Sequence, residues 1–439
     1  MTNYQSYDVA VMNYPLFLEQ KANMNLEEMV QSPNFEMEYE VPIYIHIPFC
    51  ENLCRFCIYN RMKAKEGSNS IEEYVKALIR EIKLYASHEE IQKLKVGSVF
   101  IGGGTPTILN HRQLSELIYT LSKCFKLDDC EITVECNAQN ADKSKLQLLK
   151  DLGVDRISTG IQTFQDTLRK RLNISNDSTY ISRWLEEAAR LNFKEISTDI
   201  IYGFPDMNEQ QVINDIDKAL RLPISHLSLY KLTTFAYTQL YQDVRQGKTC
   251  LPSYERVEKM FYQAHDYLLK KGFTAQSTQE YGKNERVRFW DQTYDGYGNN
   301  LSFGLSSFGY LNGFCYQNER RVLDYIKKVE TNQLPIERIS PKITEEQLLE
   351  RAMVIGFRKG EVSDTMFHQA FGKHIMDVFA DILARQIEEG FVYKNNELYR
   401  LTPKGYFHQG HISVDYMVSV FRGVSPLRKK MCIGEHRMP

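Results

Sequence analysis

Short apolar runs alternate with amphipathic stretches through the first half of this 439-residue chain. The apolar runs are rich in β-branched and aromatic residues and are bounded by turn residues, which predicts buried strands. Between them, apolar residues recur every three to four positions, as on helices that cover a sheet. The predicted strands are 41–48, 96–101, 131–135, 156–161, 196–203 and 226–232, and the predicted helices are 70–86, 112–125, 143–152, 178–191 and 209–221.

Repeated strand–helix units indicate a parallel sheet with right-handed crossovers. The sequence therefore predicts an α/β protein in which residues 42–250 form a partial (β/α) TIM-like barrel. The alternation ends near residue 250, and we interpret 251–340 as a connecting region on the substrate side. Residues 341–411 combine helices with a hairpin, which predicts a C-terminal winged-helix-like domain. The remaining segments are a polar N-terminal arm, 1–41, and a basic tail, 412–439.

The composition excludes several classes of protein. With 43% hydrophobic and 25% charged residues, the chain has the make-up of a globular protein. Its net charge of -2 gives no reason to expect nucleic acid or an anionic membrane as the main partner. No apolar run approaches the roughly 20 residues that span a bilayer, and the first residues lack the pattern of a secretory signal. We therefore expect a cytoplasmic protein, in which the nine cysteines do not form a disulfide framework.

Three of the cysteines lie together directly after the first predicted strand. Cys50, Cys54 and Cys57 occur within eight residues, with charged residues between them, which is a poor pattern for a purely structural core. A structural zinc site would need a fourth thiolate or imidazole at short spacing. His46 points away from the cysteines if its strand is regular. The third interpretation is a 4Fe–4S cluster held by three thiolates, which leaves one iron open to another ligand.

Other polar residues fall at or just after the ends of predicted strands, where barrels of this kind gather their chemistry. The triple glycine that begins at Gly102, with Thr105, ends the second strand. Glu135, Gln162, Asp199 and Tyr230 fall at or just after the ends of the later strands.

The spacing C-x3-C-x2-C, with Phe56 before the last cysteine, resembles the signature of radical S-adenosylmethionine (SAM) enzymes. Together with FIGGGTPTIL, GVDRISTGIQTF, DIIYGFP and YRLTPKGY, it is similar to the oxygen-independent coproporphyrinogen III oxidase group over about residues 42–411. The resemblance implies one 4Fe–4S cluster on the three cysteines, and SAM bound to the open iron through its amino and carboxylate groups. It further implies reductive cleavage of SAM to a deoxyadenosyl radical, with electrons from a donor such as flavodoxin or ferredoxin.

The resemblance also implies which residues contact the cofactors. Glycines let the backbone approach the methionine part of SAM closely, carboxylate and amide oxygens suit its amino group and ribose hydroxyls, and aromatic rings pack around the cluster and the adenine. Taken singly, each of these residues would more often be a capping, solvated or core residue. The implied cofactor-binding residues are Tyr44, Phe56, Gly103, Gly104, Thr105, Glu135, Gln162 and Asp199.

The sequence departs from the group at three places. Ile174 stands where the family carries an arginine toward the carboxylate of SAM, with Arg169 and Arg171 as candidate substitutes nearby. Tyr59 stands where true coproporphyrinogen oxidases have a further cysteine. The heme chaperones of the group carry a His-Asn pair where this chain has Glu285 and Arg286.

By elimination, these departures favour the members that transfer a methyl or methylene group, as in cyclopropanation, to an organic or tetrapyrrole-like small molecule. Those members use a second SAM as carbon donor. A heme chaperone or a coproporphyrinogen oxidase-like protein is the alternative. An alternative of another class is a nucleic-acid-binding or RNA-modifying factor, but acidic residues offset the basic ones in 341–411, whereas such binding needs a net basic face. We instead expect this domain to cover the barrel mouth.

Overall fold

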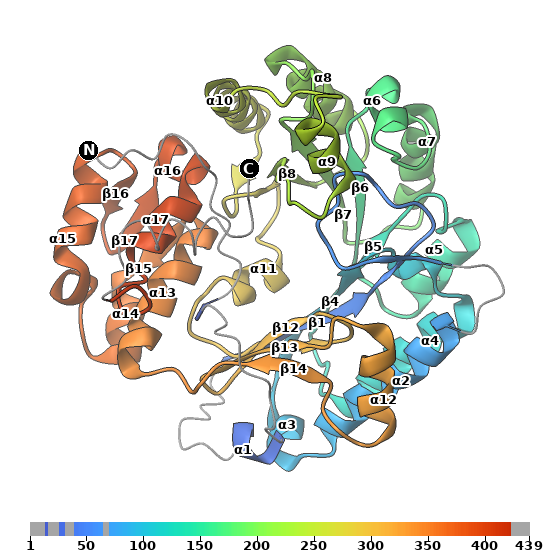
Figure 1. Ribbon diagram of the computed structural model, residues 1–439, viewed down its shortest axis with the longest axis horizontal. Helices are drawn as coiled ribbons and strands as arrows, with labels where there is room; N and C mark the ends of the chain where they lie inside the picture. The colour runs from blue at the N-terminus through green and yellow to red at the C-terminus, as the bar shows by residue number, and fades with distance from the viewer. Residues whose placement is uncertain (1–13, 16–25, 31–38, 65–69, 423–439) are drawn as a thin grey trace.

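The computed structural model describes residues 14–15, 26–30, 39–64 and 70–422, so most of the predicted arm and part of the predicted tail lie outside it. Its centre is a nine-stranded sheet in the order β11-β1-β4-β5-β6-β7-β8-β10-β9 (Figure 1). Six consecutive strands of this sheet are parallel, and all six are predicted from the sequence to within a few residues, which confirms the α/β class. They are β1 (Val41–Ile47), β4 (Val96–Gly103), β5 (Glu131–Cys136), β6 (Arg156–Gln162), β7 (Glu195–Tyr202) and β8 (His226–Lys231).

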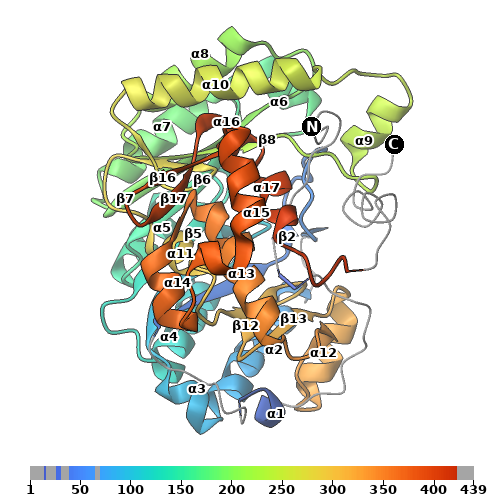
Figure 2. The same ribbon diagram turned by 90° about the vertical axis from the view of Figure 1, so that its left-hand side faces the viewer.

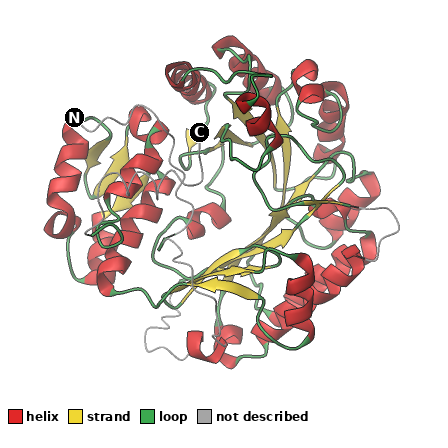
Figure 3. Cartoon of the chain, viewed as in Figure 1, coloured by secondary structure: helices red, strands yellow, loops and turns green. Residues whose placement is uncertain are grey.

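Helices cover the outer, convex face of this curved sheet (Figure 3). Two of them begin in capping boxes that the sequence encodes, at Asn110 and Asn208, where each asparagine side chain accepts a hydrogen bond from the third helical residue. The short helix α6 (Asp166–Arg171) is absent from the sequence-based prediction. The predicted covering helices are confirmed as α2 (Ser70–Ala86), α4 (His111–Cys124), α5 (Lys143–Asp151), α7 (Ser178–Ala189) and α8 (Glu209–Leu220).

The parallel strands separate an apolar outer face from a polar interior. Side chains alternate along a strand, so Ile132 and Val134 of β5 belong to the hydrophobic core between sheet and helices, while Glu131, Thr133 and Glu135 point to the opposite face. The same alternation places Arg156 and Ser158 of β6, Ser197 and Asp199 of β7, and His226 and Ser228 of β8 on the inner side. The interior of the barrel is therefore lined by polar groups.

The segment 251–340, expected as a connecting region, adds three strands to this sheet. β10 (Glu280–Gly282) pairs antiparallel with β8 and with β9 (Thr274–Ala275), while β11 (Leu301–Phe303) pairs parallel with β1. A second sheet follows, formed by β12 (Phe308–Leu311), β13 (Phe314–Asn318) and β14 (Ile336–Ile339). The long helix α10 (Tyr254–Lys270) and the short helix α11 (Arg288–Thr293) complete the region.

The C-terminal residues form a separate module with its own hydrophobic core. The predicted hairpin turns at Asn395 and Asn396, and Asn396 has φ 53°. Ile412 and Tyr416, expected in the tail, are buried in this core. Figures 1 and 2 show the module beside the barrel. Its elements are α13 (Glu345–Lys359), β15 (Glu361–Ser363), α14 (Asp364–Phe371), α15 (Ile375–Glu388), β16 (Val392–Asn395), β17 (Leu398–Leu401), α16 (Pro403–Phe407) and α17 (Gln409–Asp415).

Contacts from the 251–340 region hold this module in place. The backbone amide and the hydroxyl of Thr278 both donate to the carbonyl of Arg358 at the end of α13, over 3.0 and 3.2 Å. Tyr254 of α10 lies 3.2 Å from Nδ1 of His408 through its hydroxyl. In the part of the chain that the structure describes, no helix is long and apolar enough to cross a membrane.

Candidate active site

The three clustered cysteines line a cavity of about 370 Å³ at the carboxyl ends of the parallel strands. Cys50 lies in β2 (Phe49–Cys50), which pairs parallel with β3 (Met62–Lys63), so the cysteine loop is closed at its base. Within the loop, the amide of Cys57 donates to the carbonyl of Cys54 over 3.3 Å. The loop therefore presents all three thiols to one enclosed space.

Burial has the largest effect on the pKa values of these three thiols. It raises the pKa of Cys50 to about 11 and of Cys54 to about 12, and it also raises the pKa of Cys57. Without a cation the side chains are protonated, whereas a coordinated iron holds a thiol in its thiolate form. Within residues 39–64 and 70–422, no three His, Cys, Asp or Glu side chains converge on one metal-ion position. A 4Fe–4S cube takes each thiolate on a different iron, so its three ligands need not converge on one point.

The glycine turn after β4 packs against the cysteine loop and requires glycine. Gly103 has φ 111°, and a Cβ built on it would lie 2.5 Å from the His46 ring. A Cβ on Gly104 would lie 2.7 Å from the carbonyl oxygen of Phe49. The Gly104 amide donates to the carbonyl of Ile47 over 2.8 Å. This turn leaves its backbone exposed to the cavity where a side chain would fill the space.

The His46 side chain supports the cysteine loop and does not line the cavity. Its Nε2 lies 3.0 Å from the carbonyl of Asn60 and its Nδ1 lies 3.0 Å from the Tyr44 hydroxyl. Burial lowers the pKa of His46 to about 4, so the ring is neutral at pH 7. The orientation agrees with the expectation that His46 points away from the cysteines.

Two half-buried carboxyl groups, of Glu135 and Asp199, face the cavity from strands β5 and β7. Glu135 accepts a hydrogen bond from the Gly103 amide over 2.8 Å. Burial raises the pKa of Glu135 to about 8, with a further increase from the charge of Asp199, and it raises the pKa of Asp199 to about 7. A cationic or hydroxyl-bearing ligand would compensate for the cost of ionising these groups in a buried site.

Gln162 is turned into the cavity by a local irregularity of the sheet. The register between β6 and β7 shifts between Gly160 and Gln162, and Gln162 has φ 68°. Its Oε1 is buried and has no hydrogen-bond partner among the described residues. A buried acceptor of this kind is costly unless a bound ligand donates to it, which fits an amino group or a ribose hydroxyl. The donor set and the glycine cradle thus fit the expected cofactors.

The structure brings together all but one of the cofactor-binding residues predicted from the sequence. Tyr44 is the exception, because its ring packs beside Phe100 and Phe289 with centroid separations of 6.3 and 6.4 Å, and it does not line the cavity. The residues that line the cavity with the three cysteines are Phe56, Gly103, Gly104, Thr105, Glu135, Gln162 and Asp199.

Three basic residues that the sequence analysis did not select also line the cavity. Arg61 follows the cysteine loop, Lys231 ends β8, and Arg358 comes from helix α13 of the C-terminal module. Nζ of Lys231 lies 4.3 Å from the centre of the Phe407 ring, and burial lowers the pKa of Lys231 to about 7. No motif marks Lys231 or Arg358: Lys231 lies at the end of a barrel strand, whereas Arg358 reaches the cavity through packing of the module against the barrel.

The candidate substitutes for the missing family arginine do not line the cavity, although Ile174 does. Arg169 is buried and donates to the carbonyls of Ile161, Thr163, Ser175 and Asn176, so it shapes the loop that carries Ile174. Arg171 pairs with Asp206 over 2.7 Å.

Glu280 is a further carboxyl group inside the barrel, and its side chain is buried. It accepts hydrogen bonds from Ser228 over 2.8 Å and from Tyr230 over 3.2 Å, and His226 Nε2 lies 3.4 Å from its Oε2. Burial raises the pKa of Glu280 to about 8, and the negative charge of Asp199 adds to the increase. Tyr230 also lines the cavity, so it connects Glu280 with the site.

We expect this carboxyl group to make stability depend on pH. The folded chain retains a proton that the unfolded chain loses above its ordinary pKa near 4.5, so the free energy of unfolding falls as pH rises from about 4.5 to about 8. Glu280→Gln should make the decline of the free energy of unfolding with pH shallower. Part of the decline should remain, because the raised pKa values of Glu135 and Asp199 act in the same direction. Urea unfolding of the cofactor-free protein between pH 5 and 8.5 measures the slope. A slope unchanged from the parent would contradict the assignment, and Glu116→Gln, on the exposed face of α4, is the matched control.

Comparison with known proteins relates both parts of the chain to one group. The model of the radical SAM superfamily matches residues 44–219, and the model of the HemN C-terminal domain matches 343–408. The heme chaperone HemW of Bacillus subtilis (strain 168) is 29% identical over 383 residues, which cover 87% of this chain and 98% of that protein. The anaerobilin synthase of Escherichia coli O157:H7 is 26% identical over 393 residues, covering 88% and 86%. The solved structure of the coproporphyrinogen III oxidase HemN from Escherichia coli has a TM-score of 0.78 at 22% identity, covering 93% of this chain and 96% of that one, which shows a shared fold.

Proposed function

This chain belongs to the radical SAM superfamily as a HemN-like member, and we propose that it transfers a methyl or methylene carbon to an anionic, tetrapyrrole-like molecule. The cofactors of the superfamily are a 4Fe–4S cluster and SAM. The chemistry they supply when bound is the reductive cleavage of SAM to methionine and a deoxyadenosyl radical. In this proposal Cys50, Cys54 and Cys57 hold the cluster, and a donor such as flavodoxin or ferredoxin supplies the electron.

One observation carries the proposal, namely a single cavity whose lining combines two kinds of groups. The cysteines, the glycine turn and the acceptor side chains form one set, and Lys231 and Arg358 contribute basic side chains from β8 and the C-terminal module. Guanidinium and ammonium groups beside aromatic rings suit a planar molecule that carries carboxylates. In this arrangement the module covers the barrel mouth and supplies part of the substrate site.

Each of the two other reactions of the group lacks support from a residue of this chain. Tyr59 lines the cavity in place of the additional cysteine of coproporphyrinogen oxidases. Arg286, at a position of the chaperone His-Asn pair, bonds Glu361 over 2.7 Å and so anchors the module. No histidine or methionine is among the described residues that line the cavity, so the usual neutral ligands of heme iron are missing there. A relative named anaerobilin synthase is consistent with tetrapyrrole chemistry.

Heme delivery is the second candidate, because the similarity to the heme chaperone HemW extends over 98% of that protein. Nucleic-acid binding has no such support. Basic residues of the module pair with acidic neighbours, as Lys359 does with Asp291, Lys373 with Glu345 and Arg400 with Glu361.

The decisive experiment measures both products of SAM under anaerobic conditions. The protein is reconstituted with iron and sulfide, reduced, and incubated with SAM and heme, and deoxyadenosine and S-adenosylhomocysteine are quantified together. We expect both products to rise with added heme. Arg358→Gln should lower the heme-dependent increase while the heme-independent cleavage of SAM persists.

The other outcomes separate the alternatives. Deoxyadenosine without S-adenosylhomocysteine would replace methyl transfer by hydrogen abstraction or oxidation. Neither product, from a cluster-loaded protein that binds heme, would assign the chain to the chaperones.

A further inference from the structure

We propose that Arg61 binds the carboxylate of SAM and replaces the arginine that this chain lacks at Ile174. The inference depends on the cofactors of the superfamily and is independent of the methyl-transfer proposal. Arg61 lines the cavity together with all three cysteines, and Ile174 contributes an apolar side chain to the same wall.

The guanidinium group of Arg61 is only partly used by the protein. Its Nη2 donates to the carbonyl of Cys54, which places the group against the cysteine loop. Its Nε is buried and has no hydrogen-bond partner among the described residues. A buried cationic donor without a partner is costly, and a carboxylate is the anion whose geometry matches the planar guanidinium fork. Arg61 therefore has unused capacity for an anionic ligand.

The backbone on both sides of Arg61 is fixed by hydrogen bonds to the cysteine-bearing segment. The carbonyl of Asn60 lies 3.0 Å from His46 Nε2, and the Met62 amide donates to the carbonyl of Pro48 over 2.7 Å. The Ala64 amide donates to the carbonyl of Cys50 over 2.9 Å. Arg61 is thus held in place before the ligand arrives, which lowers the entropic cost of binding.

The charges around the cysteines make a cation necessary at this place. The carboxylate of the methionine part of SAM must approach the three thiolates and the carboxyl groups of Glu135 and Asp199. Each of these groups is negatively charged when it is deprotonated. Nη2 of Arg61 donates to the carbonyl of Cys54, which places its positive charge at the cysteine loop. Arg169 and Arg171 are engaged elsewhere, and Arg358 lies 4.5 Å over the Tyr294 ring at the end of α13. Of Arg61, Lys231 and Arg358, which line the cavity, Arg61 is the residue that bonds to the cysteine loop.

The test compares the binding of SAM with that of its decarboxylated analogue. Anaerobic titration calorimetry on the cluster-loaded protein gives both dissociation constants, and iron and sulfide analysis gives the cluster occupancy. We expect Arg61→Gln to weaken SAM about 10- to 100-fold and to leave the decarboxylated analogue unchanged. Arg61→Lys should lose less affinity for SAM, since lysine keeps the positive charge but lacks the planar guanidinium fork. Arg171→Gln removes an arginine outside the cavity and should change neither constant.

The ratio of the dissociation constants of SAM and of its decarboxylated analogue decides whether the inference holds. If Arg61→Gln weakens both ligands equally, or neither, Arg61 does not contact the carboxylate and the inference is wrong. Where Arg61→Gln fails to hold the cluster, the same ratio measured on Arg61→Lys decides. The double variant Arg61→Gln with Ile174→Arg should regain preference for SAM over the analogue. Because the readout is binding, failure of the methyl-transfer proposal leaves this test intact.

Discussion

Replacing Cys54 by alanine is expected to abolish cluster assembly and reduce deoxyadenosine formation to background, while the barrel remains folded. Cys54 lies in the loop between β2 and β3 and is only half-buried, so its removal leaves the core packing intact. With three thiolates as the protein ligands, loss of one leaves two irons open and the cluster unprotected. Iron and sulfide content, the absorbance of the cluster and anaerobic product analysis measure the effect, and circular dichroism of the cofactor-free protein measures the fold.

The matched control for this variant is Cys250→Ala, which removes an exposed cysteine from the segment between α9 (Gln239–Arg245) and α10. We expect that variant to retain the cluster and the parent rate of SAM cleavage. A Cys54→Ala protein that cleaves SAM at the parent rate would overturn the assignment of the cluster to this loop. The unfolding free energy of the two cofactor-free variants should lie within about 1 kcal/mol of the parent.

The sequence was sufficient for the parts of the site that depend on strand order. Glu135 and Asp199 are far apart in the chain, but each lies on the inner face of a strand of one parallel sheet, β5 and β7, so both side chains reach the same cavity. The glycine turn is predictable for a similar reason, since it ends β4 beside the loop that ends β1. Local pattern and topology together determine these positions.

Other parts of the site depend on tertiary packing that no local pattern encodes. Arg358 reaches the cavity because α13 docks on Thr278, and Gln162 turns inward because β6 and β7 slip in register. Tyr44 lies on a correctly predicted strand, but its ring packs against Phe100 rather than the cavity. Arg61 stands four residues after the last cysteine, and only the pairing of β2 with β3 directs it inward. Such positions follow from contacts between segments that are distant in sequence.

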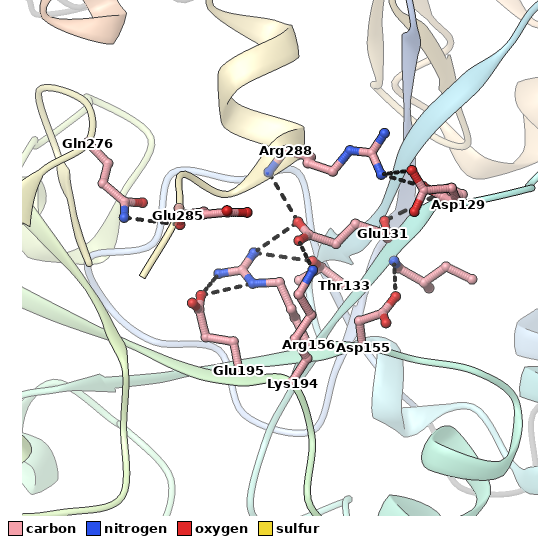
Figure 4. Close-up of polar contacts among 12 residues, drawn as sticks. Asp129, Glu131, Thr133, Asp155, Arg156, Lys194, Glu195, Gln276, Glu285 and Arg288 are labelled. Atoms are coloured by element: carbon pink, nitrogen blue, oxygen red, sulfur yellow. Dashed lines mark hydrogen bonds and ion pairs between the residues drawn. The ribbon is translucent and has the colours of Figure 1, made fainter. Parts of the chain in front are cut away.

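The polar interior of the barrel is visible in the sequence where polar and apolar residues alternate along a strand, as in EITVE. Which of the polar side chains pair with one another cannot be seen there. Figure 4 shows the result at the amino ends of β5, β6 and β7, where Arg156 lies between Glu195 and Glu131. Nε of Arg156 donates to Oε1 of Glu195 over 2.9 Å, and Nη1 donates to the Thr133 hydroxyl over 3.3 Å. The side chains of Arg156, Glu131 and Glu195 are all less than 8% exposed, so each buried charge is compensated mainly by the opposite charge of its neighbours.

Arg156→Met is therefore expected to destabilise the cofactor-free protein by about 3–5 kcal/mol, because it leaves a buried carboxylate without its counter-charge. Glu131 keeps Lys194 at 3.6 Å and the Arg288 amide at 3.1 Å, whereas Glu195 loses its described side-chain partner. Urea unfolding measures the loss, with Arg112→Met as control, since Arg112 pairs with Glu72 and Glu116 at the surface and each such exposed pair contributes at most about 1 kcal/mol.

A second variant distinguishes the loss of the charge pair from a general packing defect. Removing both charges in Arg156→Met with Glu195→Met should recover much of the stability, because no unpaired charge remains buried at this position. If the double variant is as unstable as the sum of its single variants, the two groups are not coupled and the cost arises from packing alone. The ion pair lies at the opposite end of the strands from the cysteine-lined cavity, so SAM binding by the reconstituted double variant should match the parent.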